Sequence, residues 1–212
     1  MSVFRLEHAA TTGALLCQRL GRCNRGIAAL EFGYVVPIML MMFLGTVELS
    51  QSITVDRRVS QVASATADLV ARQTSVTEAI LDDYMLIIDQ LMQPYAADLL
   101  HLTIVSVYAA VPPSGSTTVT PKVCWSYNRK TAKGANTYTD DQAYSDPKAA
   151  ELLAGGGRSI IVAEVRYDYE PLIFSYFIKN TMPMNEKFYL APRRSSSVQN
   201  GSHPSSESPC KT

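Results

Sequence analysis

The chain has 212 residues, enough for one or two domains, and its 19 basic and 19 acidic residues give a formal net charge of zero. This balance offers no basic excess for binding nucleic acid, and a hydrophobic content of 47% excludes a fully disordered chain. Four cysteines are too few for a disulfide scaffold and lack the paired spacing of a zinc site.

The first 26 residues are predicted to form a basic leader. They contain four arginines and one glutamate, so their net charge is +3, whereas the rest of the chain carries −3. An apolar segment follows from Ile27 to Leu49, with no charged side chain between Glu31 and Glu48. As a helix, these 23 residues would extend about 34 Å, against a hydrocarbon thickness of about 30 Å. We therefore predict a transmembrane helix over residues 27–49.

Two other interpretations explain the apolar segment less well. A buried helix of a soluble domain is seldom apolar around its whole circumference for about four turns. A cleaved secretory signal has an apolar region of about 7–15 residues followed by a small-x-small motif, which the residues around Gly45 fit poorly. Because basic residues flank the cytoplasmic end of membrane helices, the leader is expected in the cytoplasm and the bulk of the chain outside it. The chain is thus predicted to cross the membrane once.

Glu31 lies near the start of the apolar segment, where a carboxylate is costly. Ionisable groups within membranes are functional candidates, although a glutamate this close to the helix end can also reach headgroup water. The surrounding residues favour a function, because Arg25-Gly26 precede the run Ile27-Ala28-Ala29-Leu30-Glu31-Phe32.

This run resembles a type IV prepilin cleavage motif, in which a prepilin peptidase cuts after the glycine and a glutamate becomes the fifth mature residue. Together with Val35-Val36-Pro37, it makes residues 22–60 similar to the TadE/TadG-like pseudopilins of the tight adherence (Tad) type IV pilus family. Larger members carry a von Willebrand-type domain with an Asp-x-Ser-x-Ser motif. That motif does not occur in the sequence, so the resemblance is to the short form.

The resemblance implies a non-catalytic minor pilin-like subunit, without a cofactor, for assembly of a Tad/Flp-type pilus and processed between Gly26 and Ile27. The implied partners are a prepilin peptidase, other pilins or pseudopilins, inner-membrane platform proteins of a Tad system and membrane lipid, but no nucleic acid. The implied location is the bacterial inner membrane, with a cytoplasmic N-terminus and a periplasmic or extracellular C-terminal domain. The alternative is an uncleaved single-pass envelope protein whose exported domain binds a ligand or a surface.

Cleavage after Gly26 would also give Glu31 a physical role. It would free an amine on Ile27, and a carboxylate embedded among helices is best stabilised by a cation, which a neighbouring subunit's amine can supply. Such a pair would fix the axial stagger between subunits, as a buried polar group fixes register in coiled coils. We therefore assign subunit register and recruitment to Glu31 and the adjacent Phe32.

The rest of the chain predicts an α+β fold, pilin-like in its arrangement, with an exported domain over residues 50–194. Periodicity indicates one helix from about Ala28 to about Ala71 and a second helix that begins at a capping box, Ser75–Glu78, and stops at Pro94. A small antiparallel sheet and a short helix before a triple glycine follow, at residues 100–111, 122–127, 147–154, 159–169 and 187–191. The serine-rich segment 195–212 is predicted to be a disordered tail.

Cys124 and Cys210 both lie in the exported part, where oxidising conditions allow a disulfide. A bridge between them would close a long loop and contribute about 4 kcal/mol in the chain-entropy model. The alternative, that Cys210 stays free in the tail, carries equal weight.

No catalytic or metal-binding motif appears in the sequence. The group Asp140, Asp141 and Asp146 fits a solvated loop better than an ion site, since neither glycine nor ligand spacing supports one. A His101–Cys124 dyad has no supporting pattern. The aromatic and basic residues from Trp125 to Lys133 fit a strand and turn better than a nucleic-acid surface.

Overall fold

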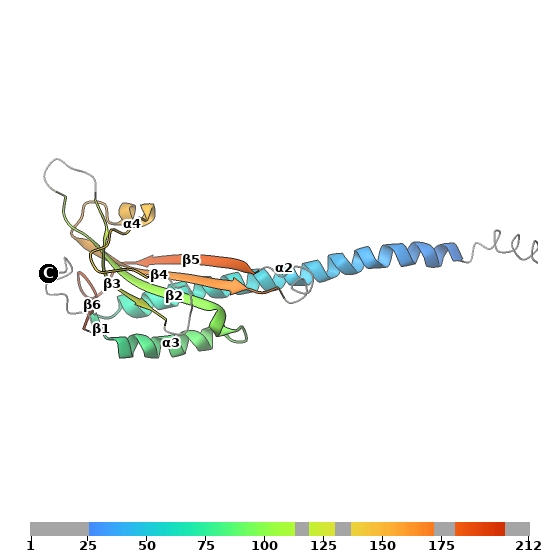
Figure 1. Cartoon of the computed structure of the whole chain (residues 1–212), viewed down its shortest axis with the longest axis horizontal. Coiled ribbons are helices and arrows are strands. Elements are labelled where there is room, and N and C mark those ends of the chain that lie inside the picture. The colour runs from blue at the N-terminus through green and yellow to red at the C-terminus, as the bar shows by residue number, and fades with distance from the viewer. Residues whose placement is uncertain (1–25, 113–118, 130–136, 172–180, 202–212) are drawn as a thin grey trace, which may run out of the picture. The chain divides into compact units, whose positions relative to one another are not determined.

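A computed structural model describes residues 26–112, 119–129, 137–171 and 181–201. The chain divides after Leu49 into two compact units, and helix α2 (Ile27–Ala71) contributes residues to both. The other elements follow in chain order: β1 (Ser75–Val76), α3 (Glu78–Met92), the 3-10 helix η2 (Ala97–Leu99), β2 (Leu100–Ala109), β3 (Lys122–Asn128), α4 (Pro147–Leu152), β4 (Arg158–Tyr169), β5 (Met182–Leu190) and β6 (Gln199–Asn200) (Figure 1). The predicted α+β class is confirmed.

The sheet of the second unit has four antiparallel strands in the order β3-β2-β4-β5. β2 and β4 pair without interruption from Leu100↔Tyr167 to Ala109↔Arg158, and β5 continues the sheet on the other side of β4. The two long central strands are therefore paired on both sides, whereas β3 and β5 are the edges of the sheet. A separate two-stranded parallel sheet joins β1 to β6.

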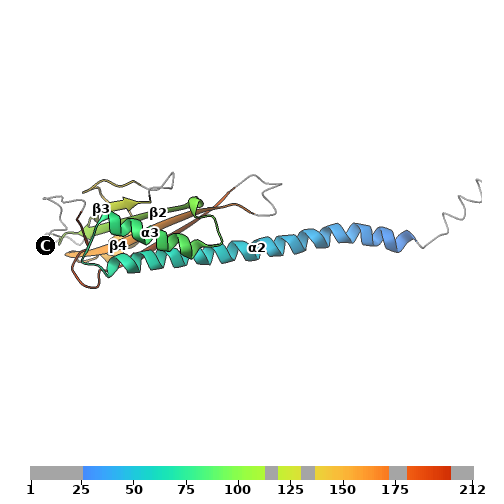
Figure 2. The same ribbon diagram turned by 90° about the horizontal axis from the view of Figure 1, so that it is seen from below.

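One face of the sheet packs on α3 and on the part of α2 that belongs to the second unit (Figure 2). Valines three or four residues apart on α2, among them Val55, Val59 and Val62, are completely buried because this spacing places them on one side of a helix. The opposite face of the sheet is covered in part by α4, whose Ala149 packs with Val105 of β2. The sheet thus lies between two apolar layers.

The long helix agrees with its predicted bounds to within one residue at either end, but the start of α3 does not agree with the predicted capping box. Thr77, rather than Ser75, caps α3 by accepting a hydrogen bond from the backbone N–H of Ile80 at 3.4 Å. Ser75 and Val76 instead adopt extended backbone and pair with β6. A strand partner distant in sequence therefore overrides the local capping signal.

Strand β5 begins at Met182, five residues before the predicted start at Lys187. The first half of the strand contains Pro183 and lacks an alternating pattern, so no local pattern predicts a strand there. Its pairing with β4 extends it, from Ile161↔Leu190 to Tyr169↔Met182.

The expected disordered tail is wrong for residues 195–201. Val198 is completely buried, and its carbonyl accepts a hydrogen bond from the indole Nε1 of Trp125 at 2.7 Å. Ser159 donates to the carbonyl of Ser196 at 2.6 Å, and β6 follows directly. One apolar residue and a strand partner are enough to hold this serine-rich segment. Residues 202–212 lie outside the described residues.

The triple glycine after α4 forms a turn that requires glycine. Gly155, Gly156 and Gly157 all have positive φ values, of 91°, 68° and 67°. At Gly156 an added Cβ would lie 2.3 Å from the carbonyl oxygen of Ala110. The close approach of this turn to the end of β2 therefore excludes any side chain at Gly156.

Candidate functional site: the exposed apolar helix

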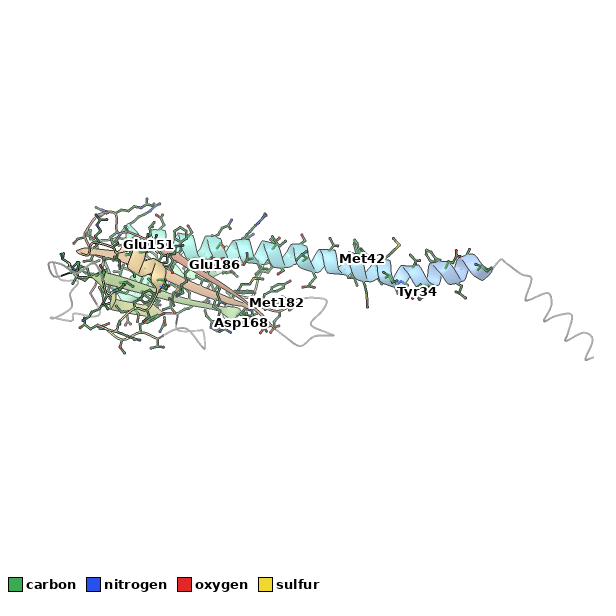
Figure 3. The ribbon with its side chains drawn as sticks, turned by 90° about the horizontal axis from the view of Figure 1, so that it is seen from above. Tyr34, Met42, Glu151, Asp168, Met182 and Glu186 are labelled. Atoms are coloured by element: carbon green, nitrogen blue, oxygen red, sulfur yellow. The ribbon has the colours of Figure 1, made fainter. Side chains whose placement is uncertain are left out.

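Most side chains between Ile27 and Leu49 are apolar and exposed. Leu30 and Tyr34 are about three quarters exposed, at 75% and 76%, and Figure 3 shows Tyr34 and Met42 projecting from the helix. In the most apolar continuous stretch of 18 residues in α2, no residue is buried. By length and composition α2 can cross a membrane, and it is the only helix in the described part of the chain that can. An apolar surface of this size requires lipid or other apolar helices around it.

Helix α2 begins at Ile27, the residue predicted to become the mature amino terminus. Gly26 precedes it and is exposed, and a Cβ added there would meet no atom within 4 Å. The Gly26–Ile27 bond therefore lies at the start of the helix, where the first backbone N–H groups have no partner within the helix. Residues 1–25 of the leader, including Cys17 and Cys23, lie outside the described residues.

Glu31 is an exposed side chain four residues after Ile27, which corresponds to a rise of about 6 Å along the helix axis. The residues one turn further on the same face, Tyr34 and Val35, are also exposed and carry no charge. Within the described ranges, no basic side chain pairs with Glu31. In an apolar environment this carboxylate would therefore need a cation from elsewhere.

Pro37 lies inside α2 without ending it. Proline has no N–H, so the carbonyl of Gly33, four residues earlier, receives no hydrogen bond from this position. The hydroxyl of Thr46 donates to the carbonyl of Met42 at 2.9 Å, so its polar group is satisfied inside the helix. Both features are tolerated in membrane helices.

Residues 26–68 match the family model of TadE-like proteins. This segment is TadE-like. The match begins at Gly26 and includes Glu31 and Pro37, so it confirms, for this segment, the resemblance drawn from the sequence. The TadE-like segment ends before α3, and no curated protein or solved structure matches the chain significantly.

Beyond the TadE-like segment, the sheet carries a buried carboxylate that sequence reasoning missed. Glu164 of β4 is only 6% exposed. It accepts hydrogen bonds from the hydroxyls of Tyr138, at 2.9 and 3.0 Å, and of Tyr144, at 2.6 Å, and pairs with Lys187 Nζ at 2.9 Å. In the sequence, Glu164 alternates with apolar residues as an exposed position would, and the loop that covers it could not be foreseen.

Asp146 joins the same cluster from the start of α4. Its carboxylate caps the helix by accepting from the N–H of Lys148 at 3.0 Å, and it also accepts from Tyr189 at 2.8 Å and Lys187 at 3.1 Å. Burial opposes ionisation, but the hydrogen bonds from Tyr189 and Lys187 hold the pKa of Asp146 below its usual value. Asp140 and Asp141 are exposed and belong to the turn before it. In the described ranges these residues form no group that could hold a metal ion.

The tyrosines of this cluster stay protonated to high pH. Burial, with the hydrogen bond to Glu164, raises the pKa of Tyr144 far above its usual value, and burial with the nearby Glu164 charge raises the pKa of Tyr138 to about 12. Each tyrosine therefore serves as a hydrogen-bond donor and is unsuited to act as a base near neutral pH. The cluster binds the 137–146 segment to the sheet.

In the described part of the chain, Cys124 does not form a dyad with His101. Cys124 is 3% exposed and disulfide-bonded, and Cys17, Cys23 and Cys210 all lie outside the described residues. The pairing of Cys124 with Cys210 therefore stays a prediction. His101 instead lies 3.2 Å from Asp168, joined through its Nε2.

The aromatic and basic run after Cys124 points into the protein. Trp125 is buried against Val198, and Tyr127 donates to Asp82 of α3. Arg129 is 6% exposed and pairs with Asp89 at 2.6 Å. These residues therefore attach α3 and the segment 195–201 to the sheet. Lys130 and Lys133 lie outside the described residues.

Proposed function

We propose that the chain is a non-catalytic minor pilin-like subunit of a Tad pilus, cut by a prepilin peptidase between Gly26 and Ile27. The observation that carries the proposal is the TadE-like segment, which begins at the proposed cleavage site and contains Glu31 in an exposed apolar helix. The leader faces the cytoplasm, and residues 50–212 are exported.

Glu31 acts in this proposal after cleavage. Removal of the leader takes away the arginines that hold the helix at the cytoplasmic face and creates an amine on Ile27. In a bundle of such helices, the amine of one subunit compensates the carboxylate of the next and fixes their stagger. The proposal is supported by the lack of any cation beside Glu31 in the described part of the chain. The partners are therefore the peptidase, other pilins and the inner-membrane platform proteins.

The first experiment determines the amino terminus of the mature protein. The full chain is expressed with a Tad prepilin peptidase, or with an inactive variant of it, and the product is analysed by intact-mass and terminal-peptide spectrometry. We expect Ile27 as the first residue only with the active enzyme. Gly26→Leu should block cleavage, whereas Gly33→Leu should not, although an added Cβ meets nothing within 4 Å at either position. A mature protein that keeps Met1 during normal pilus assembly would contradict the proposal.

The second experiment separates register from cleavage. Glu31→Gln keeps the shape of the side chain and removes its charge, so cleavage should continue while co-purification with other pilins falls by about tenfold. Tyr34→Phe, which removes a hydroxyl from the same exposed segment, is the matched control and should leave co-purification unchanged. An uncleaved envelope protein, the alternative function, would keep its leader and be indifferent to Glu31→Gln.

A further inference from the structure

The two edges of the four-stranded sheet differ in how the chain covers them. Beside β3, the segment 138–144 runs along the strand: the N–H of Val123 donates to Gln142 at 2.9 Å, and the N–H of Asp141 donates to Val123 at 2.8 Å. A further bridge joins Lys122 to Ala143. Beside β5, no strand pairs with the outer edge within the described residues. The backbone groups of β5 that point away from β4 are therefore available to another chain.

A groove runs along this bare edge, between β5 and α2. Its volume is about 560 Å³, and Ser60, Ser64 and Ala65 of α2 form one wall while Phe188 and Leu190 of β5 form the other. Phe188 is 37% exposed, although Met184 on the same face of β5 packs against the core. Small residues on the helix therefore leave an apolar strand face without full cover.

The groove carries a positive charge at one end. Arg72 and Arg193 both pair with Asp68, at 2.5 and 2.6 Å, so two guanidinium groups share one carboxylate. Both arginine side chains are more than half exposed, at 60% and 55%. Their free N–H donors can bind one more carboxylate.

The usual devices that protect an edge strand are weak on β5. Lys187 is directed to the other face of the sheet, where it pairs with Glu164 and Asp146. Pro183 removes an N–H only at the second residue, which leaves the seven residues 184–190 able to pair. Residues 184–190 contain no other proline, and their pairing with β4 is continuous, without a bulge.

We propose that β5 and the adjoining groove bind an extended segment of a partner protein, which joins the sheet as an additional strand. Such a strand would lie about 4.8 Å from β5, and every second side chain would enter the groove over Ser60 and Ser64. The segment carries apolar residues at alternate positions and a carboxylate at the end next to Arg72 and Arg193. A helix is a poorer fit, because it packs at about 8–10 Å and cannot use the backbone of β5. This proposal does not depend on leader cleavage or on Glu31.

The test uses the full chain in lipid nanodiscs and a fluorescent nine-residue peptide in which valine and threonine alternate before a terminal aspartate. We expect anisotropy to give a Kd on the order of 10 µM, and hydrogen exchange at residues 184–190 to slow by about tenfold on binding. A peptide with asparagine amide at that end should bind about fivefold more weakly, and more so at low salt. A rearranged peptide of the same composition, in which the valines are adjacent to one another and do not alternate with threonine, should not bind.

A groove-filling variant tests the location. Ser64→Tyr should weaken binding at least about tenfold, whereas Ala79→Tyr, at an exposed position of α3 outside the groove, should have no effect. Both variants keep Trp125 as the only tryptophan, so its fluorescence verifies that each is folded. Three results would each overturn the proposal: no binding at about 1 mM peptide, binding that does not slow hydrogen exchange in β5, or equal binding of the peptide with adjacent valines. The last result would indicate a helix or a nonspecific apolar ligand.

Discussion

Lys187 and Glu164 face each other across β5 and β4, with Nζ 2.9 Å from Oε1. Glu164 is 6% exposed whereas the lysine side chain is 42% exposed, so the pair joins a buried carboxylate to a cation at the surface. The same ammonium also reaches Asp146 at 3.1 Å. One lysine thus balances two carboxylates that come from different elements.

Lys187→Met should destabilise the second unit by about 1–2 kcal/mol, because it removes the ammonium 2.9 Å from the buried Glu164 carboxylate, although solvent at the lysine reduces the effect. The measurement is urea unfolding followed by the fluorescence of Trp125, which is buried and the only tryptophan. Lys148→Met is the control: the Lys148 ammonium lies 5.0 Å from the ring centroid of Tyr189, and its removal should cost about 0.5 kcal/mol. Equal losses of unfolding free energy in the two variants would show that the ion pair between Lys187 and Glu164 does not contribute to stability.

The tyrosine cluster predicts a loss of stability in alkali. In the folded chain the pKa values of Tyr138 and Tyr189 are raised to about 12, and that of Tyr144 is raised as well. In the unfolded chain all three tyrosines have the ordinary pKa of 10.0. The stabilisation is therefore complete below pH 10 and falls as the pH rises from 10 through 12, since the unfolded chain releases these protons first.

The variant Tyr144→Phe tests whether Tyr144 causes this fall of the unfolding free energy with pH. It should reduce the dependence of the unfolding free energy on pH by up to about 1.4 kcal/mol per pH unit above pH 10, while costing about 1 kcal/mol at pH 8 from the lost hydrogen bond to Glu164. Urea titrations at pH 8, 10 and 11 measure both quantities. An unchanged slope would assign the alkaline loss to other groups.

The segment 195–201 should contribute to stability despite its composition. Val198→Ala removes apolar volume beneath Trp125 and should cost about 1–2 kcal/mol. A chain that ends at Arg194 loses β6 and the acceptor of the indole N–H, so Trp125 emission should shift to longer wavelength. Truncation after Gly201 leaves these contacts in place and is the matched control for tail removal.

The sequence predicted local features well and distant pairings poorly. The long helix could be placed to within one residue because apolar spacing and the absence of a break define it. The start of α3, the first half of β5 and the packed segment around Val198 depend on strand partners far away in the chain, and no local pattern reveals them. Glu31 is predicted as a functional residue because a charge in an apolar run is visible in sequence, whereas the groove at Ser64 arises only from packing.

The disulfide of Cys124 gives a direct test of the predicted partner. Non-reducing peptide mapping should recover Cys124 linked to Cys210, with Cys17 and Cys23 as free thiols in any uncleaved protein. Cys210→Ser should lower the unfolding free energy by about 2–4 kcal/mol, because it releases a long loop and leaves a buried thiol. A Cys124 linked to a leader cysteine would contradict both the pairing and the predicted topology.

The turn after α4 provides a pair of substitutions that separate backbone strain from steric clash. Gly155 and Gly156 both have positive φ, at 91° and 68°, so alanine at either position pays a conformational cost of about 1–2 kcal/mol. Only at Gly156 would the added Cβ also lie 2.3 Å from the carbonyl oxygen of Ala110 and 2.6 Å from Cα of Val111, whereas at Gly155 it meets nothing within 4 Å. Gly156→Ala should therefore destabilise the domain by at least about 2 kcal/mol more than Gly155→Ala, since backbone atoms at the end of β2 cannot move aside as a flexible side chain would. Urea unfolding monitored at Trp125 measures the difference, and equal effects would mean that the turn can separate from β2 without cost.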